Sequence, residues 1–202
     1  MTYGEMRDFV LQLLNQYSVA GSQVPLSYNN QADDVTRIPA LTRDGLYYVT
    51  TTAKKLPAVL ELDDPEPVGN MNAYTLPDDF FQMKSGGILQ VDRSGRVSRC
   101  GRFRLLGGRQ LLLPAEPGTR YRLEYYRYPW TPEGLPQDGD FLDCPPEAQT
   151  AVAYYVAAHL AMEDSSFLYG ALYSDFELKM ARLQEGPVAE CTVAEDVYGL
   201  CG

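Results

Sequence analysis

The chain has 202 residues, 45% hydrophobic and 22% charged, a balance that excludes wholesale disorder and suits one domain, or one helical domain with an insertion. Its formal net charge of −10 at pH 7 argues against a surface that grips nucleic acid through many phosphate contacts. Apolar runs stay short of the ~20 residues a membrane span needs, and the start MTYGEMRDF lacks the basic and apolar regions of a signal peptide. We therefore expect a soluble protein, intracellular when made, with no membrane contact.

The N-terminal third has the pattern of two helical regions. Thr2 and Glu5 have the spacing of a capping box at the start of the first helix. Apolar residues then recur at steps of three and four, which places them on one stripe: Met6, Phe9, Val10, Leu13, Leu14 and Tyr17. Residues 33–55 predict a second helical region, in which Pro39 begins a new helix after a short one. Its run YYVTTT suits a strand as well, but we favour helix.

From Pro57 to about Tyr128 the pattern predicts a compact antiparallel β unit. AVLEL is a candidate strand, and residues 86–100 and 102–113 have the pattern of two hairpins, the second with a Gly-Gly turn. TRYRLEYYRY alternates polar and apolar residues, as a half-buried strand does. In LPDDFFQM, Pro77 and two acidic residues precede an apolar run, which predicts a short helix.

The C-terminal part returns to helix. Residues 145–186 predict two helices with a break near Asp164, stopped by Gly186 and Pro187. The fold class is therefore α+β: a helical core from residues 1–56 and 145–186, with an inserted β-rich unit and joining loop at 57–144. Residues 187–202 form an extended tail without a period, and its apolar residues are best explained if they dock on another surface: Val193, Val197, Tyr198 and Leu200.

Residue types that carry chemistry do not gather into a recognisable site. His159 has no metal-ligand or general-base spacing around it, so we expect a partly buried, hydrogen-bonded histidine. Pairs of adjacent aspartates lie where turns or helix starts are expected, and DGD at 138–140 lacks the rest of a calcium loop. The glycine pairs lack the residues of a phosphate-binding loop. We expect no catalytic residue, no cofactor and no metal site.

The cysteines and arginines carry weaker signals. Cys100, Cys144, Cys191 and Cys201 are far apart, so reduced thiols in a cytosolic setting are expected. Arginines crowd the predicted β unit, which indicates either a solvated face or a contact with an acidic protein surface, rather than DNA readout.

Four segments together resemble the head-to-tail adaptor proteins of tailed bacteriophages, also called head completion or connector proteins. They are TYGEMRDFVLQLLNQY, LPDDFFQM, YYRYP and PPEAQTAVAYYVAAHLAMEDSSFLYGALYSDFELKMARL, and the likeness covers most of the chain by layout. The resemblance implies a structural virion protein, made in the host bacterial cytoplasm. It implies a homo-oligomeric ring, with twelve copies expected, that joins the portal protein to the tail or to a second connector protein.

The same resemblance assigns partners to particular residues. The genome would pass through the ring in transient contact, without sequence readout, and the tail from residue 188 onward would dock on the portal. The aromatic joint of Tyr126, Tyr128 and Trp130 would pack against a neighbouring subunit. Two other classes remain open. One is a β-domain module that binds carbohydrate or protein on a platform of Trp130 and Tyr128, and the other is a small enzyme with an unrecognised pocket.

Overall fold

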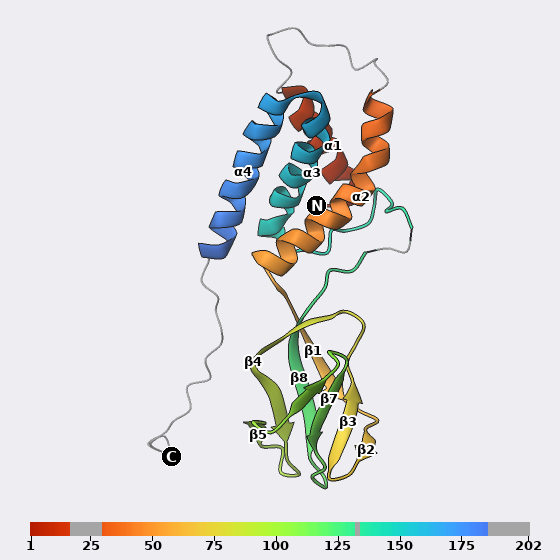
Figure 1. Ribbon diagram of the computed structural model, residues 1–202, viewed down its shortest axis with the longest axis vertical. Helices are drawn as coiled ribbons and strands as arrows, with labels where there is room; N and C mark the ends of the chain where they lie inside the picture. Colours follow the sequence, from red (N-terminus) through yellow and green to blue (C-terminus); the bar gives the residue numbers. More distant parts are fainter. Residues whose placement is uncertain (17–29, 132–133, 186–202) are drawn as a thin grey trace.

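A helical unit and a β unit follow one another along the long axis of the computed structural model, which describes residues 1–16, 30–131 and 134–185 (Figure 1). The helical unit contains α1 (Tyr3–Gln16), α2 (Asn30–Thr52), the short 3-10 helix η2 (Pro146–Ala148), α3 (Gln149–Asp164) and α4 (Ser166–Glu185). The whole β unit is inserted between α2 and η2. This arrangement confirms the α+β fold class.

Helix α3 is the centre of the helical unit and contacts α1, α2 and α4. Its sequence is apolar on all sides because neighbours surround it: Ala151, Val152, Ala153, Val156, Ala157 and Ala158 have no exposed surface. Small residues let the helices approach closely. At Gly45 of α2, an added Cβ would lie 2.9 Å from the ring of Tyr155 in α3.

The β unit is a sandwich of two antiparallel four-stranded sheets. One sheet has the order β1 (Leu56–Leu62), β8 (Arg120–Arg127), β4 (Phe80–Val91) and β5 (Val97–Arg99). The other has the order β2 (Glu66–Val68), β3 (Met71–Thr75), β7 (Gln110–Pro114) and β6 (Arg104–Leu106). The sheets enclose their own core, centred on Ile88, Leu111, Leu113, Tyr121 and Leu123. This core shares no residue with the core of the helical unit.

Several local predictions are confirmed. Thr2 and Glu5 form the capping box: the Glu5 amide donates to Thr2 Oγ1 at 3.2 Å and the Thr2 amide to Glu5 Oε2 at 2.9 Å. Both hairpins are present as β4 with β5 and β6 with β7, and the strand β8 alternates between buried and less buried residues. YYVTTT is helical, and α3 and α4 meet at a break after Asp164.

Two local predictions are wrong, and one element was not predicted. LPDDFFQM is not a helix, because Phe80 begins the long strand β4 and stacks on Tyr125 of β8, with ring centroids 5.7 Å apart. Residues 30–52 form one helix, so Pro39 does not begin a new one; burial of Ile38 beside it offsets the missing backbone hydrogen bond. The turn-rich segment after β1 holds the β2–β3 hairpin, which the sequence pattern did not reveal.

Candidate functional site

The joint between the two units is held by two tyrosines at the end of β8: Tyr126 within the strand and Tyr128 just after it. Tyr128 donates its amide to the carbonyl of Asp79 at 2.8 Å, and its ring packs between Tyr47 of α2 (5.5 Å) and Phe81 of β4 (5.0 Å). The ring of Tyr126 lies under the ammonium groups of Lys55 (5.2 Å) and Lys84 (5.5 Å). These two tyrosines therefore join the units within one chain, and their proposed contact with a neighbouring subunit stays a prediction.

A partly buried ion pair anchors the loop that returns to the helical unit. Arg127, the last residue of β8, binds Asp143 through two parallel hydrogen bonds of 2.5 and 2.8 Å. The Trp130 amide donates to the same carboxylate. Burial raises the pKa of Asp143, but the hydrogen bonds from Arg127 and the Trp130 amide outweigh burial, and the pKa is lowered. The carboxylate is therefore charged at neutral pH and fixes both ends of the loop.

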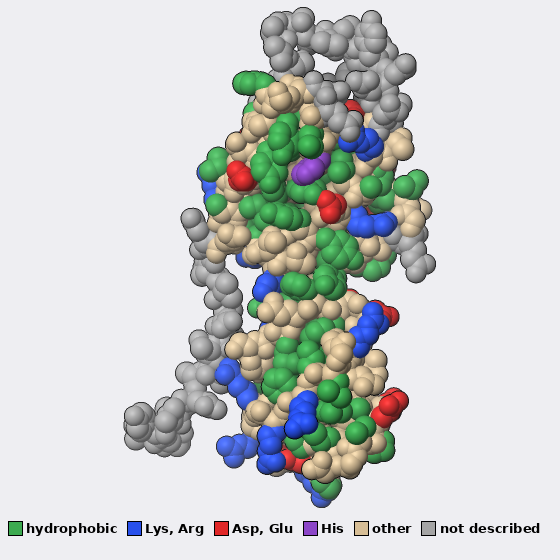
Figure 2. All heavy atoms as spheres, viewed as in Figure 1, with side chains coloured by type: hydrophobic (Ala, Val, Ile, Leu, Met, Phe, Trp, Pro, Cys, Tyr) green, Lys and Arg blue, Asp and Glu red, His purple; other side chains and the backbone are tan. Residues whose placement is uncertain are grey.

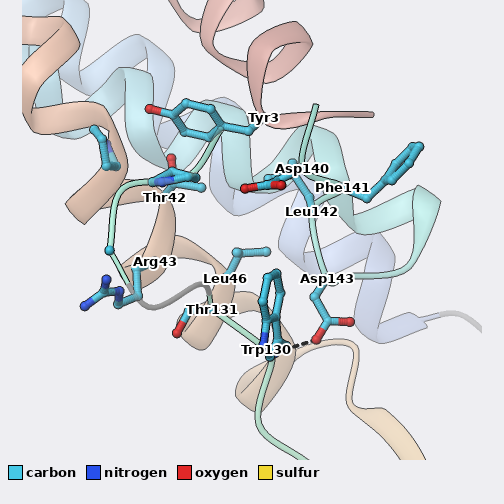
Figure 3. Close-up of a pocket in the computed structure, with 13 residues that line it drawn as sticks. Tyr3, Thr42, Arg43, Leu46, Trp130, Thr131, Asp140, Phe141, Leu142 and Asp143 are labelled. Atoms are coloured by element: carbon cyan, nitrogen blue, oxygen red, sulfur yellow. Dashed lines mark hydrogen bonds between the residues drawn. The ribbon is translucent and has the colours of Figure 1, made fainter. Parts of the chain in front are cut away.

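The loop and the helices α1 and α2 line a small cavity (Figure 3). Its volume is about 40 Å³, room for a few water molecules, each of which needs ~10–15 Å³ by the same measure. The Trp130 ring stands between Leu46 and Asp143, whereas the Phe141 ring points away from the cavity (Figure 3). This volume is too small for a substrate, so the outward-facing side chains of the loop are the more informative feature.

Three apolar side chains of the loop are held outward. Trp130 is 59% exposed, Leu135 78% and Phe141 76%. Sequence reasoning selected Trp130 as a large aromatic residue but missed Leu135 and Phe141, since no pattern in a loop tells which apolar side chains point to solvent. Together we call these three residues the joint patch.

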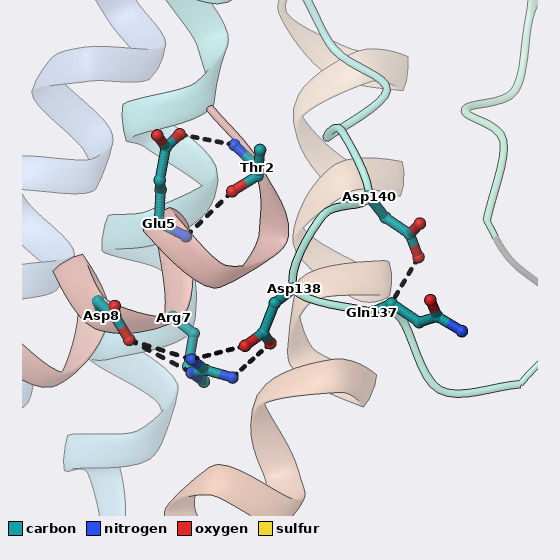
Figure 4. A network of polar contacts seen from close by, with 7 residues as sticks. All are labelled: Thr2, Glu5, Arg7, Asp8, Gln137, Asp138 and Asp140. Carbon is teal, nitrogen blue, oxygen red and sulfur yellow. Dashed lines mark hydrogen bonds and ion pairs between the residues drawn. The ribbon is translucent and has the colours of Figure 1, made fainter.

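The loop is held at the start of α1 by backbone hydrogen bonds and by the contact between Arg7 and Asp138, which Figure 4 shows. The amides of Tyr3 and Gly4 donate to the carbonyls of Asp140 (2.7 Å) and Asp138 (3.0 Å), so two of the free N–H groups at the helix start are satisfied. Arg7 binds the Asp138 carboxylate at 2.5 Å. The DGD segment is a turn, as predicted, and it docks the loop on the helical unit.

An aromatic cluster surrounds the single histidine on the helical unit. The Nδ1 atom of His159 lies 2.8 Å from the carbonyl oxygen of Tyr155, and its ring lies 4.0 Å from the Tyr155 ring. Tyr173 and Tyr48 continue the cluster to the surface, where Figure 2 shows the histidine within apolar side chains. Burial, and then the hydrogen bond to Asp44, raises the pKa of Tyr155. His159 is hydrogen-bonded and partly buried, as expected. The spacing of 155 with 159 and of 169 with 173 could have revealed this cluster.

Within residues 1–16, 30–131 and 134–185, no group of three His, Cys, Asp or Glu side chains could hold a metal ion. None of the helices in the same ranges is long and apolar enough to cross a membrane. Cys100 and Cys144 are buried free thiols. The proposed docking residues Val193, Val197, Tyr198 and Leu200 lie outside the described residues.

Comparison with known proteins gives little further information. No protein family matches the sequence, and no curated protein does. Among solved structures, the chain is similar to one from the neck of an empty GTA particle computed with C6 symmetry. The TM-score is 0.29 and the sequence identity 13%, over 87% of this chain and 88% of that chain. At this level of similarity the function has to be argued from the residues of the chain itself.

Proposed function

We propose that this chain is a structural virion protein, a head-to-tail adaptor whose copies form a closed ring between portal and tail. The observation that carries the proposal is the joint patch: Trp130, Leu135 and Phe141 project from a loop that an ion pair and a helix start hold in place. Exposed apolar side chains on a fixed scaffold are typical of surfaces that another protein covers.

The layout of the chain supports the role of an assembly protein. Two units with separate cores give each copy two independent surfaces, one for the neighbour in the ring and one for a partner above or below it. Contacts between unlike surfaces that close on themselves are how one chain type makes a ring. The ring, with twelve copies expected, would let DNA pass without sequence readout, and the net charge of −10 would disfavour tight DNA binding.

The structure gives no support to a carbohydrate platform. The Tyr128 ring already packs against the rings of Tyr47 and Phe81, which makes it a poor platform for a sugar. Trp130 alone would remain, beside a cavity of about 40 Å³. The exposed apolar side chains of the joint patch suit a contact with a protein surface better than a small-molecule site.

Removal of residues 188–202 tests the portal contact. The truncated chain should keep the circular dichroism of the full chain, because both cores lie within the described residues, but it should lose co-purification with its portal protein. Unchanged portal binding by the truncated chain would contradict the proposed docking role of the tail.

Substitution of the joint patch tests the role of these side chains in assembly. The variant W130A/F141A should fold as the wild type does, since these side chains are 59% and 76% exposed, but should self-associate less tightly in sedimentation experiments. The matched control is Phe167→Ala, another aromatic residue that is 75% exposed and lies at the start of α4. Equal self-association of W130A/F141A and the control would argue against the patch as an interface.

A further inference from the structure

We propose that neighbouring copies meet edge to edge through their β units, with the basic edge of one copy against the acidic edge of the next. The basic edge is formed by β5 and β6 with the residues that join them, and the acidic edge by β1 and β2 with the residues that join them. This inference rests on the proposed ring and names the surfaces that would build it.

The topology leaves these strands open on opposite sides of the sandwich. In the orders β1-β8-β4-β5 and β2-β3-β7-β6, the first and last strands each have only one neighbour. Because β1 leads directly into β2 and β5 leads into β6, the open edges of the two sheets coincide on each side. Figure 1 shows β5 on one side of the β unit and β2 on the other. Each side therefore presents unpaired backbone groups to a neighbour.

Charge is separated between these two edges. Residues 93–115 contain six arginines and no acidic residue, and residues 56–83 contain six acidic residues and no lysine or arginine. In Figure 2 most of the basic side chains visible on the β unit lie on the side of β5. The arginines of β5 and β6 and the acidic residues of β1 and β2 thus lie on opposite sides, although Arg109 and Asp78 of the two blocks form an ion pair.

Most of these charges form no ion pair with the residues that the structure describes. In the part of the chain that the structure describes, Arg109 pairs with Asp78 between the two blocks, and Glu61 of the acidic block pairs with Arg122 of the neighbouring strand β8. The edge charges that form no ion pair there are exposed: Arg99, Arg102 and Arg104 on the basic edge, and Asp63, Asp64 and Glu66 on the acidic edge. Arg93 and Arg96, in the connection between β4 and β5, are exposed as well.

Exposed apolar side chains accompany the charges on both edges. The basic edge carries Val97 (53% exposed), Phe103 (43%), Leu105 (45%) and Leu106 (47%). The acidic edge carries Val59 (58%) and Val68 (51%). Arginine and aromatic residues mixed with apolar ones are typical of protein interfaces, and this mixture favours a protein partner over the phosphates of DNA.

Opposite charge on the two edges determines which surfaces can meet. Two basic edges or two acidic edges repel each other, so only unlike edges can pair. A contact between unlike surfaces passes from copy to copy in one direction and gives a ring when it closes. Charged edge strands also protect a monomer from aggregation. That protection does not explain why one edge is basic and the other acidic.

Charge reversal provides the test. The basic-edge variant R99E/R104E and the acidic-edge variant D63K/E66K should each self-associate at least about tenfold more weakly than the wild type by sedimentation velocity at low salt. The chain that carries all four substitutions should regain assembly, because the unlike charges still face each other. D175K/E177K on α4 is the control with the same charge change as the acidic-edge variant and should assemble as the wild type does.

The outcomes separate this inference from the proposed function. If the wild type forms a ring and both edge variants form it equally well, the edge pairing is wrong while the ring remains. If the fourfold variant fails to assemble although its circular dichroism is unchanged, the pairing is also contradicted. A wild-type chain that is monomeric at every salt concentration contradicts both. Loss of binding to a short mixed-sequence DNA duplex in R99E/R104E, with assembly unchanged, would assign the basic edge to DNA instead.

Discussion

Among single residues, Asp143 has the largest influence on the joint. Its carboxylate accepts hydrogen bonds from the Arg127 guanidinium and from the Trp130 amide, which join the end of the β unit to the loop. The side chains of Arg127 and Asp143 are only 27% and 21% exposed, so loss of either partner leaves the other poorly solvated. No sequence pattern marks Asp143, since its two partners are defined only by the return of the loop.

Asp143→Asn should lower the free energy of unfolding by about 2 kcal/mol, because the guanidinium of Arg127 loses its charged partner. The measurement is urea denaturation followed through the fluorescence of Trp130, the one tryptophan in the sequence. Asp138→Asn is the control: its carboxylate is 66% exposed in the pair with Arg7, so its loss should have a smaller effect. Equal effects of the two substitutions would argue against a special role for Asp143.

The same carboxylate predicts an acid transition of the joint. Because the pKa of Asp143 is lower in the folded chain than in the unfolded one, its contribution to stability is complete above the unfolded value of about 4 and is lost as the pH falls through the folded value. Trp130 fluorescence should therefore change at a pH below about 4. Asp143→Asn should lack this transition; its persistence in that variant would assign it to another group.

Cys144 should be unreactive in the folded protein. Burial, together with the nearby carboxylates of Asp143 and Glu147, raises the pKa of its thiol to about 12 against a smaller opposing effect of the N-terminal ammonium group. Labelling with iodoacetamide at neutral pH, read by peptide mass spectrometry, should leave Cys144 unmodified in buffer and modify it in urea. Equal labelling in both conditions would show that the loop opens readily.

Among the elements, the helices and strands whose apolar residues recur at regular spacing were predictable from the sequence. The inward side chains of β8 alternate through Tyr121, Leu123 and Tyr125, and the apolar residues of α1 follow one stripe. The errors arose where tertiary contacts decide. Phe80 follows Pro77 and two acidic residues as a helix start would, yet it extends β4 because Tyr125 of β8 offers a stacking partner. Pro39 remains inside α2 because packing of the helix outweighs one hydrogen bond.

Gly87 in β4 provides a test at this scale. An added Cβ would lie 2.3 Å from the carbonyl oxygen of Glu124 and 2.9 Å from that of Lys84, at an irregularity in the pairing of β4 with β8. Gly87→Ala should destabilise the β unit by at least about 2 kcal/mol. Gly101→Ala, which meets no atom within 4 Å, is the control.

The response of the helical unit to that substitution is equally informative. The two hydrophobic cores share no residue. The far-ultraviolet circular dichroism of the helices should therefore persist at urea concentrations where Gly87→Ala has already unfolded the β unit. Simultaneous loss of helical and β structure would show that the joint couples the units more strongly than their separate cores indicate.

For the whole molecule, the sequence did not show in which direction the side chains at the joint point. Tyr128 packs inward between the two units, while Trp130, Leu135 and Phe141 face solvent. The open edges of the sandwich could not be predicted either, because they depend on the order of strands in the two sheets. The acidic and basic blocks can be read from the sequence. Only the structure shows that they contribute to opposite edges of the sandwich.

The central claim is that copies of this chain form a closed ring, and imaging of the purified full-length protein by electron microscopy, with native mass spectrometry on the same sample, tests it most directly. We expect ring-shaped particles with a central opening and a single copy number, with twelve as the expected value. Monomers alone, or open filaments of variable length, would contradict the account.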